Sequence, residues 1–281
     1  MKETSLYLWH HRGGRVGVLL LLAMVFVAVF APLIAPYEPN AQISGSELQG
    51  MSLTHWFGTD FLGRDILSRT IYGARVSLFA GALAVILGAA LGIFMGITAG
   101  YMGGWVDSTM MRLSDAISAF PAILLGAAIV AVLGPGFVQV AIAIAIAQSP
   151  LFARLARALA ISEARLEYIE AAESMGASKA SIILRHILPN AAGPLAVQAS
   201  LSVGIAILLE AGLSFLGLGV QPPTPSWGQM LADSLRFIDF IPAYAIFPGL
   251  ALTVVLVGVN LLADAMRDRV DPQHQNLGGG E

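Results

Sequence analysis

The chain has 281 residues, of which 57% are hydrophobic and only 12% are charged, and its net charge is −3. Water-soluble domains carry about 25% charged residues, so this composition argues against a soluble domain and favours a membrane protein. Cysteine is absent, which excludes disulfide bonds and thiolate metal sites, and the small net charge points to no nucleic-acid partner.

Long runs without charge predict helices that span a membrane. A span needs about 20 apolar residues, and runs of more than about 18 argue against a soluble helical core. The run 116–153 is too long for one span and contains Leu133-Gly134-Pro135-Gly136, a turn signal, so we divide it into a hairpin. We therefore predict an all-α polytopic protein with six transmembrane helices. They lie in the runs 16–37, 76–106, both halves of 116–153, 187–209 and 240–263.

The first of these runs resembles a signal peptide, because it follows Lys2, Arg12 and Arg15 and has an apolar middle. It is long, however, and no clear small-x-small cleavage site precedes Tyr37. We therefore interpret it as a retained helix or an uncleaved anchor.

The distribution of positive charge predicts the orientation. With the N-terminus in the cytoplasm, cytoplasmic segments hold 11 of the 15 lysines and arginines, and outer segments hold 4. Lysine and arginine concentrate on the cytoplasmic side of membrane proteins, so we predict that both termini are cytoplasmic.

The predicted segments follow from this orientation. They are a cytoplasmic N-terminus (1–15), a first transmembrane helix (16–36), an extracytoplasmic segment (37–75), a transmembrane core (76–264) and a cytoplasmic tail (265–281). The core includes a polar cytoplasmic segment (154–189) and an extracytoplasmic loop (214–239). Trp227 in that loop is expected at a membrane–water boundary.

The polar segment predicts two short helices joined by a bend. Alanine, leucine, arginine and glutamate favour a first helix over 154–175, and Gly176 can adopt the positive φ that reverses the chain. Ser178 can cap a second helix over 179–187, and Pro189 marks the next element. The small side chains of Ala171 and Ala172 would allow a partner surface to approach closely. An ordinary amphipathic hairpin is the alternative.

Four glycines lie on one face of the second span, at intervals of four residues. They are Gly88, Gly92, Gly96 and Gly100. Small residues at this spacing let two membrane helices pack backbone to backbone, so we predict a helix-packing interface. A pore-lining role is the alternative.

Strongly polar residues in the spans are few: Gln148, Gln198, Glu210 and Asn260. Ionisable groups at membrane depth are functional candidates, and we take Gln148 and Glu210 as candidate pathway residues. Glu210 lies near the end of its span, where a solvated or locally paired carboxylate is an equal alternative. No second charge lies nearby in sequence, so no proton relay is indicated.

Motifs for catalysis are missing from the sequence. Neither lysine, Lys2 or Lys179, lies in the glycine-rich frame of a P-loop, and no His-Glu-x-x-His or Gly-x-Ser-x-Gly pattern occurs. We therefore expect a chain that is not an enzyme, and that binds neither a metal ion nor a cofactor.

The polar segment resembles the EAA loop of bacterial ATP-binding-cassette importer permeases. The matching residues within 170–189 are Glu170, Ala171, Ala172, Gly176, Leu188 and Pro189. His186 departs from the pattern, which has an aliphatic residue two positions before the Leu-Pro pair. Two further stretches resemble the dipeptide/oligopeptide/nickel permease family and its DppC/OppC-like branch: 58–78, with Gly58-Thr59-Asp60 and Gly63-Arg64-Asp65, and 213–228, with Gln221-Pro222-Pro223.

This resemblance implies a type I importer permease with the MetI-like fold, in the inner membrane of a bacterium. It implies as partners a second, homologous permease, two P-loop ATPase subunits that bind ATP and magnesium, and an extracytoplasmic substrate-binding protein. The EAA loop would couple the chain to the ATPases. The substrate stays open among dipeptides, oligopeptides, glutathione and nickel chelates. A secondary transporter, a channel or an intramembrane enzyme is an alternative from another class, but paired intramembrane charges and catalytic motifs are not visible.

Overall fold

The structure is a computed structural model that describes residues 11–270. Within this range every regular element is helical, and the only β-type pairing is one isolated bridge between Thr59 and Asp65. The prediction of an all-α fold is confirmed. The elements are α2 (Arg12–Val29), α3 (Ala31–Ile34), α4 (Ile66–Met102), α5 (Gly104–Ser118), α6 (Ala122–Leu133), α7 (Phe137–Glu163), α8 (Glu167–Ser174), α9 (Lys179–Ile182), the π-helical η1 (Ile183–Ile187), α10 (Leu188–Phe215), α11 (Trp227–Ser234) and α12 (Ala243–Val270).

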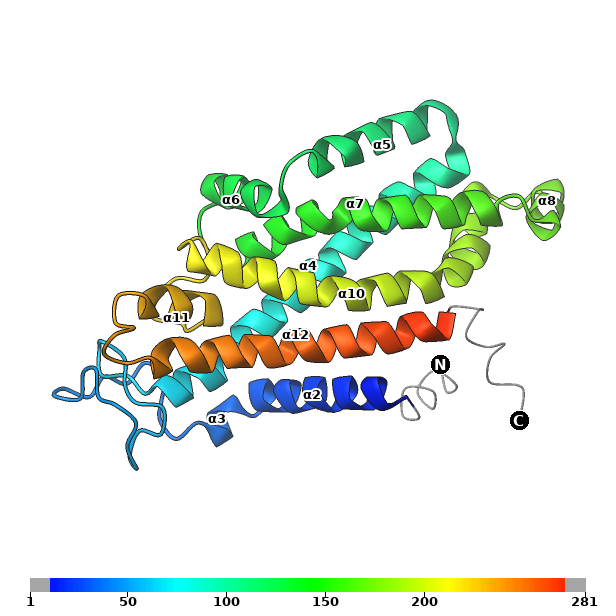
Figure 1. Cartoon of the computed structure of the whole chain (residues 1–281). Helices are drawn as coiled ribbons and strands as arrows, with labels where there is room; N and C mark the ends of the chain where they lie inside the picture. The colour runs from blue at the N-terminus through cyan, green and yellow to red at the C-terminus, as the bar shows by residue number, and fades with distance from the viewer. Residues whose placement is uncertain (1–10, 271–281) are drawn as a thin grey trace, which may run out of the picture.

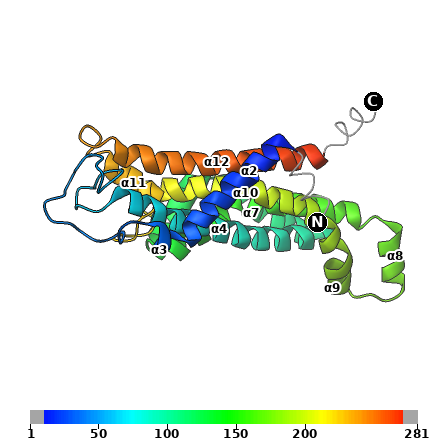
Figure 2. The ribbon, with the colours of Figure 1, turned by 90° about the horizontal axis from the view of Figure 1, so that it is seen from below.

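The long helices α2, α4, α7, α10 and α12 form an elongated bundle (Figure 1). At one end, which we call the loop end, lie α11 and the irregular segment 35–65. At the other, the elbow end, α8 and α9 project beyond the bundle (Figure 2). The start of α2 and the end of α12 also lie at the elbow end, where His11 Nε2 is 3.5 Å from Asp268 Oδ2.

Within residues 11–270, five helices are long and apolar enough to cross a membrane: α2, α4, α7, the continuous stretch from α9 to α10, and α12. A sixth span exists only if α5 and α6 count together, and they are bent by 94° at the break between them. The predicted third helix is therefore not straight. Pro121 explains the break, because proline lacks a backbone N–H and disfavours helix at the residue before it.

Two helices extend past the charged residues at which the sequence analysis ended its spans. The helix α4 begins at Ile66, where Asp65 caps it by accepting a hydrogen bond of 2.7 Å from Ser68 N. The helix α7 continues to Glu163 and therefore includes Arg154. A charged side chain does not end a helix, so counting charge-free residues underestimates helix length.

Trp227 is fully buried, contrary to the expectation that it lies at a membrane–water boundary. Its indole Nε1 donates a 2.9 Å hydrogen bond to the backbone oxygen of Thr70 on α4. Gly73 leaves room for the ring, because a Cβ there would lie 3.0 Å from Trp227 Cδ1. The tryptophan therefore joins α11 to α4 inside the protein.

Buried charges fasten segment 35–65 to the start of α4. Asp60 is fully buried and its Oδ2 lies 2.7 Å from Arg64 Nε and 3.5 Å from Arg69 Nε. Arg69 is 1% exposed and also donates to the backbone oxygens of Pro39, at 3.1 Å, and Pro223, at 3.4 Å. Asp60 thus neutralises the charge of two arginines, and Arg69 joins the start of α4 to segment 35–65 and to Pro223.

Replacement of Asp60 by asparagine is expected to destabilise the loop end strongly. The variant removes the negative charge that neutralises Arg64 and Arg69, and breaking a buried ion pair in this way costs about 3–5 kcal/mol. We expect a melting temperature several degrees lower for the detergent-solubilised complex. The matched control is Glu38→Gln, an exposed carboxylate on the same segment. Equal melting temperatures for the two variants would show that the buried cluster is not stabilising.

Candidate coupling surface and helix contacts

The elbow, residues 164–187, turns at Gly176. This residue has a φ of +84°, a left-handed conformation that favours glycine. Gly176 N donates to Glu173 O at 2.9 Å, and Ala177 N donates to Ala172 O at 3.0 Å. These two bonds are the Schellman pattern, which ends α8 and reverses the chain. Ser178 then caps α9 and accepts a 3.3 Å hydrogen bond from Ser181 N.

The elbow packs on the bundle through a narrow apolar face. Its buried members Ile169, Ile182 and Ile187 form one cluster with Ile97 of α4, Ala156 and Ala160 of α7, and Ala191 and Leu195 of α10. The opposite face of α8 is open to solvent. This arrangement fixes the elbow in place and leaves one side available to a partner.

The six residues predicted for coupling do not all lie on that open side. Glu170, Ala171 and Gly176 are exposed, and Ala172 is buried. Leu188 is half-buried and Pro189 is exposed, both at the start of α10 rather than beside α8.

Two further apolar residues within the predicted EAA loop (170–189) are exposed, Met175 at 82% and Leu184 at 63%, and neither is among the six residues predicted for coupling. They project from a segment beyond the bundle, so an apolar partner surface is indicated. The position of Met175 directly before Gly176 was an available signal.

Hydrogen bonds join the elbow to three long helices. Tyr101 Oη of α4 donates to Glu173 Oε1 at 2.7 Å. Asn190 Nδ2 of α10 donates to Glu163 Oε1 of α7 at 2.6 Å and to Tyr168 Oη of α8 at 2.9 Å. Tyr168 donates to Glu163, and this hydrogen bond raises the pKa of the phenol, which stays protonated near neutral pH. A displacement of α8 would therefore be transmitted to α4, α7 and α10 together.

The glycine stripe of α4 lies against the backbone of α7. A Cβ added to each glycine would meet a backbone oxygen of α7, in a parallel register. The added Cβ would lie 2.9 Å from Ala145 O at Gly88, 2.3 Å from Ser149 O at Gly92, 2.2 Å from Ala153 O at Gly96, and 2.6 Å from Arg157 O at Gly100. No side chain fits at these positions, so the two helices pack backbone to backbone.

The two candidate pathway residues lie inside the bundle. Gln148 is 2% exposed, and its amide atoms have no hydrogen-bond partner within the described residues. Glu210 is 1% exposed and accepts a 2.7 Å hydrogen bond from Ser214 Oγ. The structure brings neither to a surface. A pathway role for either stays a prediction and would require the surrounding helices to separate.

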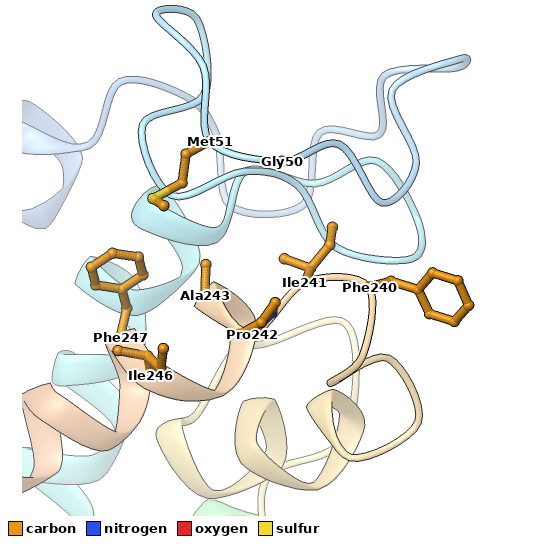
Figure 3. Close-up of a pocket in the computed structure, with 8 residues that line it drawn as sticks. All are labelled: Gly50, Met51, Phe240, Ile241, Pro242, Ala243, Ile246 and Phe247. Carbon is orange, nitrogen blue, oxygen red and sulfur yellow. The ribbon is translucent and has the colours of Figure 1, made fainter.

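Charged residues do not gather into a metal site within residues 11–270. A pocket of about 200 Å³ lies at the loop end, where Met51 points toward the start of α12 (Figure 3). Its lining is apolar: Gly50, Met51, Phe240, Ile241, Pro242, Ala243, Ile246 and Phe247. No lining side chain can pair with a charged ligand, and we assign the pocket no binding role.

Two family models match this chain. The model described as "Binding-protein-dependent transport system inner membrane component" matches residues 91–275, which include the elbow and most of the glycine stripe. The model described as "N-terminal TM domain of oligopeptide transport permease C" matches residues 1–50. Both descriptions agree with the resemblance found in the sequence.

Curated relatives are similar over most of the chain. The dipeptide transport system permease protein DppC of Alkalihalophilus pseudofirmus is 45% identical over 92% of this chain and 85% of its own length. The glutathione transport system permease protein GsiD of Escherichia coli is 46% identical over 91% of this chain and 84% of its own length.

A solved structure of the MetNI methionine ABC transporter, described as inward facing, is similar in fold. The TM-score is 0.58, with 18% identity, over 73% of this chain and 95% of that chain. At this identity the likeness concerns the fold alone, and it confirms the predicted MetI-like architecture.

Proposed function

Because the chain belongs to the family of binding-protein-dependent transport system inner membrane components, we propose that it is the permease subunit of an ATP-driven importer of dipeptides or other short peptides. It forms half of the translocation pathway, and a second, homologous permease forms the other half. The chain itself is not an enzyme. ATP and magnesium bind to two partner ATPase subunits, and an extracytoplasmic binding protein delivers the substrate.

The structure of the elbow is the observation that supports this proposal most directly. It projects beyond the bundle, exposes Glu170, Ala171 and Met175, and is joined by hydrogen bonds to the long helices. A surface of this kind suits docking to a separate motor subunit, because movement of the elbow reaches the spans directly. Its small residue Ala171 permits close approach by the ATPase.

The proposed orientation places the elbow end in the cytoplasm of a bacterial cell, with the bundle in the inner membrane. Two observations support it. Lysine and arginine residues on this side outnumber those of the outer segments by 11 to 4 when spans end at the first charge, and by 9 to 4 when Arg112 and Arg154 are left out. The start of α2 and the end of α12 lie at the same end as the elbow, so both termini are proposed to be cytoplasmic.

The substrate class is proposed from the relatives, and glutathione is the second candidate. A dipeptide permease and a glutathione permease are 45% and 46% identical to this chain, so identity does not separate them. Both substrates are short peptides with a free amino group and a free carboxylate.

The test is ATP hydrolysis by the purified complex with its binding protein, measured with a dipeptide panel, glutathione and a nickel chelate. We expect dipeptides to stimulate hydrolysis most strongly. Stimulation by glutathione alone would favour the second candidate. Stimulation by the nickel chelate and by no peptide would contradict the peptide assignment.

A further inference from the structure

A charged face on α5 and α7 is open to the outside of this chain. It consists of Arg112, Asp115 and Ser118 of α5 and Arg154 of α7. Arg154 Nη1 lies 3.5 Å from Asp115 Oδ1, and Arg154 Nη2 donates to Ser118 Oγ at 3.1 Å. The side chains of Arg154 and Asp115 are 48% and 72% exposed.

The depth of Asp115 follows from the helices beside it. Two ion pairs at different positions along the helices hold α5 against α7: Arg157 with Asp107, and Arg154 with Asp115. Asp115 lies eleven residues beyond Gly104, where α5 begins at the elbow end, which is about 16 Å along the helix at about 1.5 Å per residue.

The charge-free part of α4 allows this distance to be compared with the bilayer. Residues 76–102 span about 40 Å, whereas the hydrocarbon layer is about 30 Å thick. Even if the whole surplus of about 10 Å projected at the elbow end, Asp115 would lie inside the hydrocarbon layer. The charge pattern of the sequence alone predicts Arg112 and Arg154 in cytoplasmic segments, because each predicted span ends at the first charge.

An exposed ion pair at this depth cannot face lipid, where charged side chains are strongly disfavoured. Water is required instead. The carboxylate of Asp115 has several acceptor positions, and its one contact to Arg154 is long, so a dry protein interface would leave those positions unsatisfied. The paired Asp107 and Arg157 show the contrast, because two close contacts join them.

We propose that this charged face lines the water-filled translocation pathway and supplies counter-charges to peptides that carry both a free amino group and a free carboxylate. Arg112 and Arg154 would attract the carboxylate, and Asp115 would attract the ammonium group. The proposal rests on the proposed function for the identity of the cargo. The accessibility of the face to water does not depend on that identity, so its test is separate.

The first experiment measures water access in the assembled complex. The chain contains no cysteine, so Ser118→Cys creates a single labelling site. Its matched control is Leu22→Cys, at an apolar residue of α2 that is 57% exposed. A membrane-impermeant, water-soluble thiosulfonate should react with the first at least about tenfold faster, because the reactive thiolate forms in water and not in lipid. Equal, slow labelling would overturn the proposal, since the face would then be covered by lipid or by the second permease.

The second experiment tests how the charged side chains affect reagent access and transport. In the Ser118→Cys chain, Asp115→Asn should lower the ratio of labelling rates between cationic and anionic reagents. In transport assays, Asp115→Asn and Arg154→Gln should each reduce dipeptide uptake by about two- to fivefold, the effect expected for solvent-exposed charge interactions. The control is Asp264→Asn, an exposed residue of α12 paired with Arg267 at 4.0 Å. Unchanged uptake in both test variants, with normal labelling of Ser118→Cys, would overturn the counter-charge role.

Discussion

Replacement of Gly96 by leucine is expected to abolish accumulation of the assembled protein. A Cβ at this position would lie 2.2 Å from Ala153 O and 2.8 Å from Ala156 Cβ, and both contacts are on the rigid helix α7. The two helices would have to separate, and the neighbouring contacts at Gly92 and Gly100 would open with them. We expect a cost above the about 1–3 kcal/mol that is typical of overpacking.

The measurement is the yield of membrane-inserted protein and of the purified complex. Gly193→Leu is the matched control, because this glycine also lies in a long helix and a Cβ there would meet no atom within 4 Å. We expect near-normal yield for the control and little or no complex for Gly96→Leu or Gly92→Leu. Normal yield and transport in both stripe variants would show that α4 and α7 do not pack closely.

Replacement of Gly176 by valine is expected to uncouple transport while the membrane protein stays folded. No atom lies within 4 Å of a Cβ at this position, so the effect is confined to the backbone. At a φ of +84°, a residue with a side chain costs about 1–2 kcal/mol, and a β-branched residue costs more. The turn that ends α8 would be lost, and the exposed face of the elbow would no longer be presented correctly.

Uptake and co-purification of the ATPases should be compared across a series at this position. Gly176→Asn is the control, since asparagine tolerates the left-handed conformation better than valine does. We expect near-normal uptake for asparagine. For valine we expect low uptake and either dissociation of the ATPases or hydrolysis that substrate no longer stimulates. Glu170→Lys should have a milder effect of the same kind. Full uptake with an intact complex in Gly176→Val would contradict the coupling role of the turn.

Local chemistry made several features of the fold predictable. The positive φ of Gly176 and the cap formed by Ser178 each depend on residues within a few positions. The turn at 134–136 separates α6 from α7 for the same reason. The break before α6 was equally local, because Pro121 was visible in the sequence, but a rule based on charge alone passed over it.

Most contacts between distant parts of the chain were not predictable from a single sequence. The glycine register of α4 defined a packing face but did not identify its partner. Small residues recur at the same four-residue spacing on α7, at Ala145, Ser149 and Ala153, and this was an available signal. The contact between Arg69 and Pro223 joins residues 154 positions apart, and no local pattern indicates it. The burial of Trp227 against α4 has the same origin.

The central claim is that this chain transports peptides only when partner ATPases drive it. The most direct test is dipeptide uptake into proteoliposomes that contain this chain and the second permease, with and without the two ATPase subunits, each with binding protein outside and ATP inside. We predict uptake in the complete complex and background uptake without the ATPases. Equal uptake in both preparations would contradict the claim and would favour a channel or a secondary transporter.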